Sequence, residues 1–194
     1  NERLEFSMNL RIASLLLLFG WIFLKYHMLG SESTFMWGMM YHFTAMLGIG
    51  FTACWIGTRT FRETPEFFEG FKHVAKHVLS YSAGATVSIW VWYHYIIADA
   101  TLERFNTMKE MVKTQFSSEA DYLSYVRENG LDPHLSLSDW IASTTSQIEL
   151  MYSPQTHISL SLMAYLVLGL FISLIANVLW TKVWFAQQVP IDIR

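Results

Sequence analysis

The sequence is poor in charged residues and in cysteine. Only 15% of its 194 residues are Asp, Glu, Lys or Arg, whereas soluble domains average about 25%. The formal net charge of −3 offers no basic surface for nucleic acid, so we expect no nucleic-acid partner. The single cysteine, Cys54, lies in an apolar run, which excludes a disulfide framework and a CxxC motif. We expect Cys54 to pack as a small hydrophobic residue.

The common motifs of enzymes are also absent. The chain has no Gly-rich phosphate loop, no GxSxG elbow and no paired carboxylates of the kind that hydrolases use. His73 and His77 have the spacing of a two-histidine zinc pair, but the sequence between them lacks the glutamate of HExxH. With Lys72 and Lys76 beside them, we expect a basic face that attracts anionic lipid headgroups. These absences favour a protein that is not an enzyme.

Long apolar runs take the place of these motifs. The chain is 53% hydrophobic and 16% aromatic. Four runs, at about residues 12–29, 35–57, 74–98 and 157–180, are long enough to cross a ~30 Å hydrocarbon core as helices. The sequence therefore predicts an all-α integral membrane protein, a four-helix bundle formed by residues 1–98 and 157–194.

The third helix is predicted to be the longest element. Its pattern runs from residue 65 to about 116 without an internal proline, which corresponds to roughly 75 Å of helix. Half of it would lie in the bilayer and half in water. Residues 99–156 then read as a small cap of short amphipathic helices outside the membrane. Two capping boxes, Ser118 with Asp121 and Ser136 with Asp139, mark helix starts within this cap.

Small residues recur at every fourth position in three of the spans. In lipid, this spacing allows helix backbones to approach closely, so it predicts faces for helix packing. The three stripes are Thr44, Gly48 and Thr52; Ser80, Gly84 and Ser88; and Gly169, Ser173 and Asn177. We expect Asn177 to form an interhelical hydrogen bond.

Basic residues near the span ends predict the orientation. Eight of them fall on one side: Arg3, Arg11, Arg59, Arg62, Lys72, Lys76, Lys182 and Arg194. By the positive-inside rule, both termini would be cytoplasmic. Residues 99–156, with nine acidic against four basic residues, would face the periplasm. The prediction is a multi-pass protein of the bacterial inner membrane.

Four histidines are the sharpest candidates for chemistry. They lie one per span in the predicted outer third of the membrane: His27, His42, His94 and His157. Neutral imidazoles on facing bundle helices could bind haem, a divalent metal or a quinone. The alternative is that histidine, like the neighbouring tyrosines, simply suits the membrane interface. His42 and His94 are the deepest of the four.

Four segments have a familiar pattern: 67–72, 93–99, 102–105 and 169–175. Through them the chain resembles, over about residues 8–185, an uncharacterised family of small four-span bacterial inner-membrane proteins, a domain of unknown function. The chain differs from the family pattern at Ala98-Asp99-Ala100, where a proline or an acid pair is usual, and its outer loop is longer. The family has no established site residues, so the resemblance implies a fold and no activity.

Two hypotheses about function follow. The first is a non-enzymatic accessory or scaffolding subunit of a larger membrane complex, with lipids and other membrane-protein subunits as partners. The alternative is a metal-, haem- or quinone-binding redox protein that uses His42 and His94 with His27 or His157. A role beside an envelope glycolipid or lipoprotein pathway is a third possibility, suggested by the basic cytoplasmic face and the acidic cap.

Overall fold

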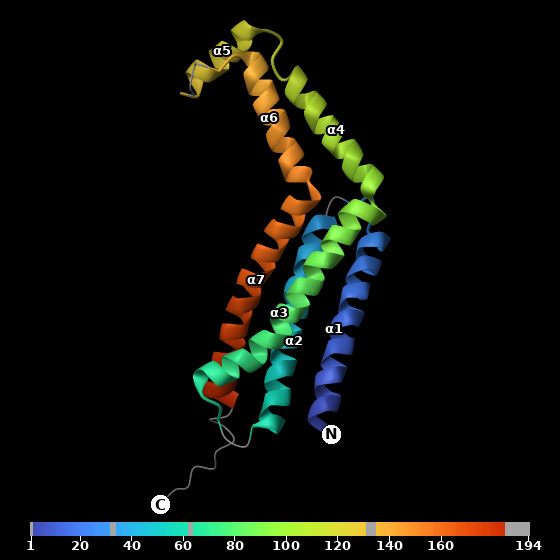
Figure 1. The fold of residues 1–194 in the computed structure, drawn as a ribbon, viewed down its shortest axis with the longest axis vertical. Coiled ribbons are helices and arrows are strands. Elements are labelled where there is room, and N and C mark those ends of the chain that lie inside the picture. Colours follow the sequence, from blue (N-terminus) through green and yellow to red (C-terminus); the bar gives the residue numbers. More distant parts are fainter. Residues whose placement is uncertain (1, 32–33, 62–63, 131–134, 185–194) are drawn as a thin grey trace, which may run out of the picture. The chain divides into compact units, whose positions relative to one another are not determined.

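The computed structural model describes residues 2–31, 34–61, 64–130 and 135–184, and within these ranges the chain is helical with no β-strand (Figure 1). The elements in order are α1 (Glu2–His27), α2 (Thr34–Thr60), α3 (Phe67–Val91), the π-helix η1 (Trp92–Ile96), α4 (Ala98–Thr114), α5 (Glu119–Glu128), α6 (Leu137–Tyr152), α7 (Pro154–Leu179) and the π-helix η2 (Trp180–Trp184). The prediction of an all-α protein is confirmed for these residues.

The chain divides into two compact units. The first unit consists of residues 1–89 and 161–194, and the second consists of residues 90–160. Helix α7 contributes its first turns to the second unit and the remainder to the first. Arg62, Arg194 and the side chain of Arg3, which entered the orientation prediction, lie outside the described residues.

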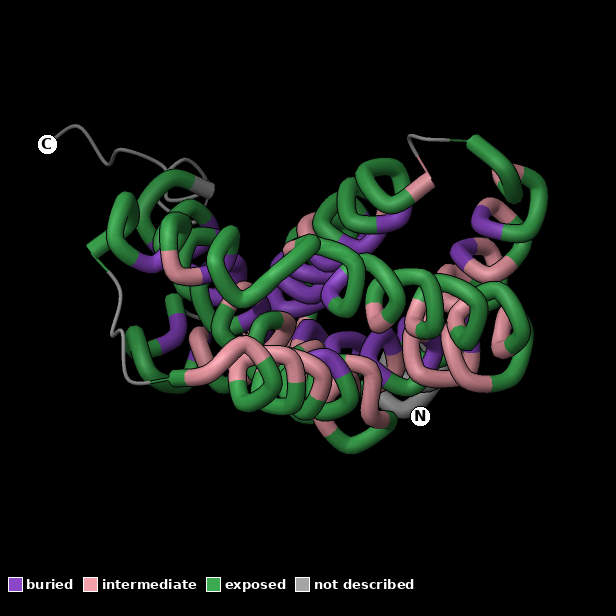
Figure 2. The backbone as a smooth tube through the Cα atoms, turned by 90° about the horizontal axis from the view of Figure 1, so that it is seen from above, coloured by how far each residue is buried: buried purple, intermediate pink, exposed green. Residues whose placement is uncertain are grey.

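The first unit packs α1, α2, α3 and α7 around one core. Its buried residues come from the inward faces of these helices, drawn in purple in Figure 2. They include Met46, Ile49, Val78, Tyr81, Ile172 and Trp180. Cys54 is fully buried among them, and its Sγ donates to the carbonyl oxygen of Ala176 at 3.5 Å, which confirms that it packs within the core.

Glycine allows the helices of the first unit to approach closely. A Cβ on Gly57 would collide with the indole ring of Trp180, and a Cβ on Gly70 would collide with Oδ1 of Asn177. The Asn177 amide donates to the carbonyl oxygen of Phe67 at 3.0 Å, which confirms the predicted interhelical hydrogen bond. These contacts hold α7 against α2 and α3.

The predicted packing stripes have different outcomes. Gly169, Ser173 and Asn177 are all buried, so the stripe on α7 is confirmed. The stripe on α2 is wrong as a contact within the chain, because Thr44, Gly48 and Thr52 are exposed and a Cβ on Gly48 would meet nothing within 4 Å. The inward face of α2 uses the neighbouring positions instead, including Ala45, Gly50, Ala53 and Gly57. On α3, Ser80 is exposed and Ser88 is buried.

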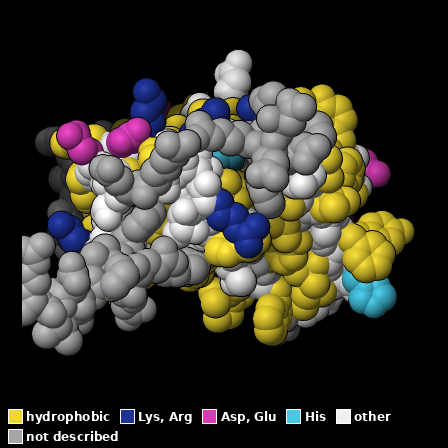
Figure 3. Space-filling view, turned by 90° about the horizontal axis from the view of Figure 1, so that it is seen from below, with side chains coloured by type: hydrophobic (Ala, Val, Ile, Leu, Met, Phe, Trp, Pro, Cys, Tyr) yellow, Lys and Arg dark blue, Asp and Glu magenta, His cyan; other side chains and the backbone are white. Residues whose placement is uncertain are grey.

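Within the part of the chain that the structure describes, three helices are long and apolar enough to cross a membrane: Asn9–His27, Thr34–Thr60 and Pro154–Val183. Their large apolar side chains point outward; for example, Phe23 is 71% exposed and Phe171 is 59% exposed. The space-filling view shows hydrophobic side chains gathered mainly on the right of the face drawn, with basic side chains near its centre and other charged side chains toward its edges (Figure 3). Exposed apolar side chains on this scale are unfavourable in water and compatible with contact to lipid.

Helix α3 is not among these three candidates, although the sequence predicts a span at 74–98. Its first half carries Glu69, Lys72 and Lys76, which lower its hydropathy most. Its inward face adds Ser82, Thr86 and Ser88. Each hydroxyl donates to the carbonyl oxygen four residues earlier, at 3.0 to 3.1 Å. The hydroxyls are therefore satisfied within the helix itself, so they are compatible with a lipid environment.

The prediction of one continuous helix over residues 65–116 is wrong. Helix α3 begins at Phe67, widens into η1, and the helical conformation is lost at Ile97, with φ −116° and ψ 35°. The Ile97 amide donates to the carbonyl oxygen of Trp92 at 2.9 Å, five residues back, and α4 then starts as a new helix. The run of aromatic and β-branched residues over 92–97 has low helix propensity, which favours a break at this place.

In the second unit, α4 and α6 pack side by side in antiparallel directions, with α5 between them in the chain (Figure 1). Phe105 lies against Tyr152 with ring centroids 5.6 Å apart, and Lys109 pairs with Glu149 at 2.7 Å. A cluster of aromatic rings near α5 joins Phe116, Tyr122 and Trp140. Both predicted capping boxes are confirmed in part: the side chains of Ser118 and Ser136 accept from the amides of Asp121 and Asp139.

Candidate functional site

Two of the four candidate histidines meet in the second unit. Nε2 of His94 lies 3.1 Å from Nδ1 of His157, and the ring centroids are 5.1 Å apart. Both side chains are half-buried. In the neutral pair, one ring nitrogen donates its hydrogen to the lone pair of the other. We call these two residues the His94–His157 pair.

Local structure fixes His157 in place. Ser153 caps the start of α7: its Oγ accepts from the amide of Thr156 at 3.2 Å, and its carbonyl oxygen accepts from the amide of His157 at 3.1 Å. Pro154 follows as the first helical residue, where its missing N–H costs nothing. His157 therefore lies in the first complete turn of a well-capped helix.

His94 comes from η1, the π-helical segment. Such single-turn π segments are rare in proteins, and many of those that occur lie at functional sites. The wider turn changes the direction of the side chains relative to a continued α-helix, and His94 faces His157 in this arrangement. Three aromatic rings lie near the pair. The ring centroids of Tyr93 and Tyr152 are 5.7 and 6.3 Å from that of His157, and the ring centroid of Trp90 is 6.4 Å from that of His94.

His42 forms a separate site in the first unit. It is 0% exposed, its ring stacks on Trp21 at 4.8 Å, and its Nδ1 lies 2.9 Å from the hydroxyl of Tyr81. Tyr165 meets the imidazole edge-on at 5.3 Å. Nε2 of His42 is buried and has no hydrogen-bond partner among the described residues. The imidazole is thus enclosed by the aromatic rings of Trp21, Tyr81 and Tyr165.

Lys25 lies near this aromatic cluster and is also buried. Its ammonium donates to the carbonyl oxygen of Thr34 at 3.4 Å and lies 5.9 Å from the Trp21 ring. The Trp21 indole in turn donates to the carbonyl oxygen of Gly38 at 3.1 Å. These contacts tie α1 to the start of α2, and they account for a buried cation by packing and hydrogen bonding.

His27 joins neither site. It is exposed and stacks on Phe23 of its own helix at 6.0 Å. Across the residues that the structure describes, no three or more His, Cys, Asp or Glu side chains gather in a way that could hold a metal ion. The four candidates thus form one pair, one buried aromatic site and one exposed residue.

His73 and His77 do not make a zinc pair either. Nε2 of His73 lies 3.0 Å from the carbonyl oxygen of Ala53, so this nitrogen carries the hydrogen and donates it. The two imidazole rings meet edge-on, 5.6 Å apart. Lys72 and Lys76 are exposed, as a basic face requires.

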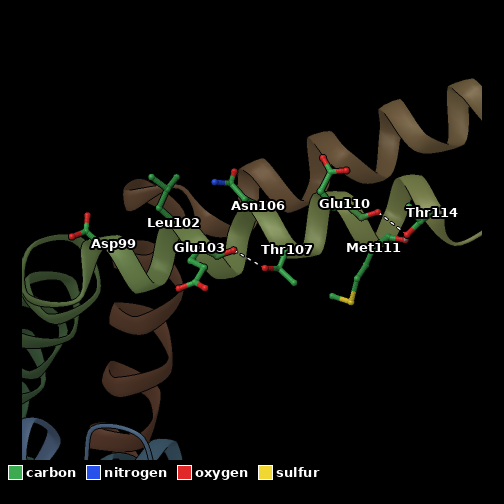
Figure 4. A pocket seen from close by; sticks show the side chains of 8 residues that line it. All are labelled: Asp99, Leu102, Glu103, Asn106, Thr107, Glu110, Met111 and Thr114. Atoms are coloured by element: carbon green, nitrogen blue, oxygen red, sulfur yellow. Dashed lines mark hydrogen bonds between the residues drawn. The ribbon is translucent and has the colours of Figure 1, made fainter.

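An open groove runs along α4, and all eight residues that line it come from that one helix (Figure 4). They are Asp99, Leu102, Glu103, Asn106, Thr107, Glu110, Met111 and Thr114. This is the face of α4 that turns away from α6. With a single helix as its wall, the groove encloses no small molecule.

The fold and these sites define an all-helical protein with three helices able to span a membrane. No family model, curated protein or solved structure matches the chain.

Proposed function

We propose that the protein is a multi-pass protein of the bacterial inner membrane and serves as an accessory or scaffolding subunit of a larger membrane complex. In this proposal α3 is the fourth span, both termini are cytoplasmic, and residues 99–156 form a periplasmic cap. The resemblance to the four-span family of unknown function belongs to the same proposal.

The distribution of polar and apolar side chains supports the membrane part of the proposal. The described apolar residues of α1, α2 and α7 are largely outward, whereas His42, Ser82, Ser173 and Asn177 are buried. A soluble bundle has the opposite arrangement. Helix α3 has 25 residues, which span about 38 Å and exceed the ~30 Å of a hydrocarbon core.

The observation that carries the accessory role is apolar surface in the second unit. Leu102, Met111, Leu150 and Met151 are all more than half exposed, on helices that the proposal places in water. Exposed apolar surface outside the membrane marks a site for a protein partner. The exposed stripe Thr44, Gly48 and Thr52 on α2 adds a face suited to a second membrane helix.

Isolation from native membranes tests this role. When the protein is expressed at its native level and extracted in mild detergent, it should bring down a partner in fixed stoichiometry. Mass spectrometry identifies the partner, and size-exclusion chromatography measures the size of the complex. Leu150→Glu places a charge at a 64% exposed position and should reduce the recovery of that partner at least tenfold. A stable monomer without partners would contradict the accessory role.

Ala120→Glu is the matched control. Ala120 is exposed in the first turn of α5, where a carboxylate is favoured by the helix dipole. The substitution adds the same charge to the second unit and removes only a methyl group, so recovery of the partner should be unchanged. Equal loss in both variants would assign the effect to charge and would argue against an apolar interface at Leu150.

A further inference from the structure

The two facing nitrogens of the His94–His157 pair lie almost as far apart as two histidine nitrogens that bind one metal ion. Two imidazole nitrogens bound to one Zn²⁺, each at roughly 2.0–2.1 Å and at a tetrahedral angle, lie about 3.3–3.4 Å apart. Nε2 of His94 and Nδ1 of His157 are 3.1 Å apart. Binding of an ion would need a separation of a few tenths of an ångström, a turn of both rings so that their lone pairs face the ion, and movement of the shared hydrogen to the outer nitrogen of its ring.

We propose that His94 and His157 bind a divalent late transition-metal ion, Zn²⁺ or Cu²⁺, in the second unit. The ligand atoms would be Nε2 of His94 and Nδ1 of His157, which face each other in the structure. This proposal does not depend on the accessory role, because it concerns only the contact between η1 and the start of α7.

Both ligands come from well-defined backbone. His157 follows the Ser153 cap, and its amide is bonded to the Ser153 carbonyl oxygen at 3.1 Å. His94 lies in η1, whose last π-type hydrogen bond runs from the Ile97 amide to the Trp92 carbonyl oxygen at 2.9 Å. The ion therefore enters a pair of rings that is already convergent, so little ordering entropy is lost on binding.

The surroundings suit an exchangeable ion. The two rings are half-buried, so water can reach the ion and fill the positions that the protein leaves open. The second unit has nine acidic against four basic residues in its sequence, which raises the local concentration of cations. Imidazole ligands select Zn²⁺ and Cu²⁺ over Mg²⁺ or Ca²⁺, which prefer oxygen.

The ligand count limits the affinity. No third His, Cys, Asp or Glu joins the pair to make a three-ligand group among the described residues. The site is therefore a two-histidine site completed by water, weaker than a structural zinc site and suited to reversible binding. Nitrogen ligands generally bind Cu²⁺ more tightly than Zn²⁺, so this site should have the higher affinity for Cu²⁺.

The test is metal binding by the purified full chain in detergent, without a histidine tag, using Zn²⁺ and Cu²⁺ alone. Isothermal titration should give one equivalent that is lost, or at least about tenfold weaker, in His94→Ala and in His157→Ala. Electron paramagnetic resonance of the Cu²⁺ form should show coupling to two nitrogens in the wild type and to one in each variant. Circular dichroism checks that both variants keep their helix content.

His27→Ala is the matched control, because His27 is exposed and in contact only with a ring of its own helix in the pairs described. Its binding isotherm should equal that of the wild type. Absence of binding by the wild type would overturn the proposal, since the pair would then be a hydrogen bond only. Binding that persists unchanged in His157→Ala would overturn it as well.

Discussion

At the scale of single residues, His42 has the most demanding position. If the Tyr81 hydroxyl donates to Nδ1, the ring hydrogen lies on Nε2, which is buried without a hydrogen-bond partner among the described residues. In the other tautomer, Nε2 has a bare lone pair in the same place. The neighbouring rings of Trp21 and Tyr165 supply packing and, at most, a weak N–H···π contact. The Tyr81 hydroxyl therefore carries the polar stabilisation of this ring.

Tyr81→Phe should destabilise the first unit by about 1–3 kcal/mol, because the second nitrogen of a fully buried imidazole then loses its partner. Thermal unfolding or SDS titration in mixed micelles measures the change. Tyr95→Phe serves as the control, since Tyr95 is 65% exposed and should show no effect. Equal stability of the two variants would mean that the contact between His42 and Tyr81 contributes nothing.

The sequence singles out His42 but not Tyr81. Tyrosines recur through the predicted spans, where they are expected as residues suited to the membrane interface. In the structure the Tyr81 hydroxyl lies 2.9 Å from Nδ1 of His42, between two helices that are far apart in the sequence. A local pattern does not show which tyrosine a packed helix turns toward the imidazole.

The sequence includes His94 and His157 among four candidate histidines, but it does not predict which of the four meet. Spans three and four were expected to bring one histidine each to the outer third, and these two do meet. His27 and His42 could not be assigned from the sequence alone, because hydropathy gives the depth of a residue and not the direction in which its side chain points. Only the packing of α1 shows that His27 faces outward.

At the scale of the helices, two of the four glycines of α2, Gly48 and Gly57, have opposite environments. Gly57 faces the Trp180 ring so closely that any side chain must displace it, whereas Gly48 faces open space. A period of four in the sequence marks both Gly48 and its neighbours as candidates for packing, but it cannot tell which face is turned inward. This is why the stripe at Thr44, Gly48 and Thr52 was placed wrongly inside the bundle.

Gly57→Ala should destabilise the chain by about 1–3 kcal/mol, since overpacking forces the Trp180 ring to move. Gly48→Ala should be neutral or stabilising, because alanine has the higher helix propensity and the new methyl group meets nothing within 4 Å. Both variants are compared in the same unfolding assay. Greater damage from Gly48→Ala would show that α2 packs through its other face.

The two helix starts with a capping box were predicted correctly. Ser118 and Ser136 act as caps, because a capping side chain bonds within three residues and needs no tertiary information. The break at Ile97 carries no glycine or proline. It depends on how six bulky residues, 92–97, are accommodated, and that is decided by packing beyond the reach of a local pattern.

At the scale of the whole molecule, the candidate spans divide by their share of the core. Helices α1 and α7 bury a small share of their apolar windows and α2 buries more, whereas α3 buries polar side chains and falls outside the three membrane candidates. A helix surrounded by other helices can carry serine and threonine at membrane depth, since its neighbours and its own carbonyl groups replace lipid. The composition of α3 is therefore compatible with the fourth span that we propose, although its hydropathy does not mark it as one.

The proposed topology makes opposite predictions for two exposed positions. Ser124 lies on α5 and Lys72 lies near the start of α3, and both are exposed. In intact cells, a membrane-impermeant maleimide should label Ser124→Cys from the periplasm, whereas Lys72→Cys should react only after the membrane is permeabilised. The native Cys54 is fully buried and should give no background.

The two variants together separate the orientation from the number of spans. Since α3 connects the two positions, labelling of both from the outside would mean that it does not cross the membrane, and the protein would then have three spans. Labelling of Lys72→Cys alone would keep four spans but reverse the orientation, against the positive-inside rule. Only protection of Lys72→Cys with reaction of Ser124→Cys agrees with a fourth span and a cytoplasmic basic face.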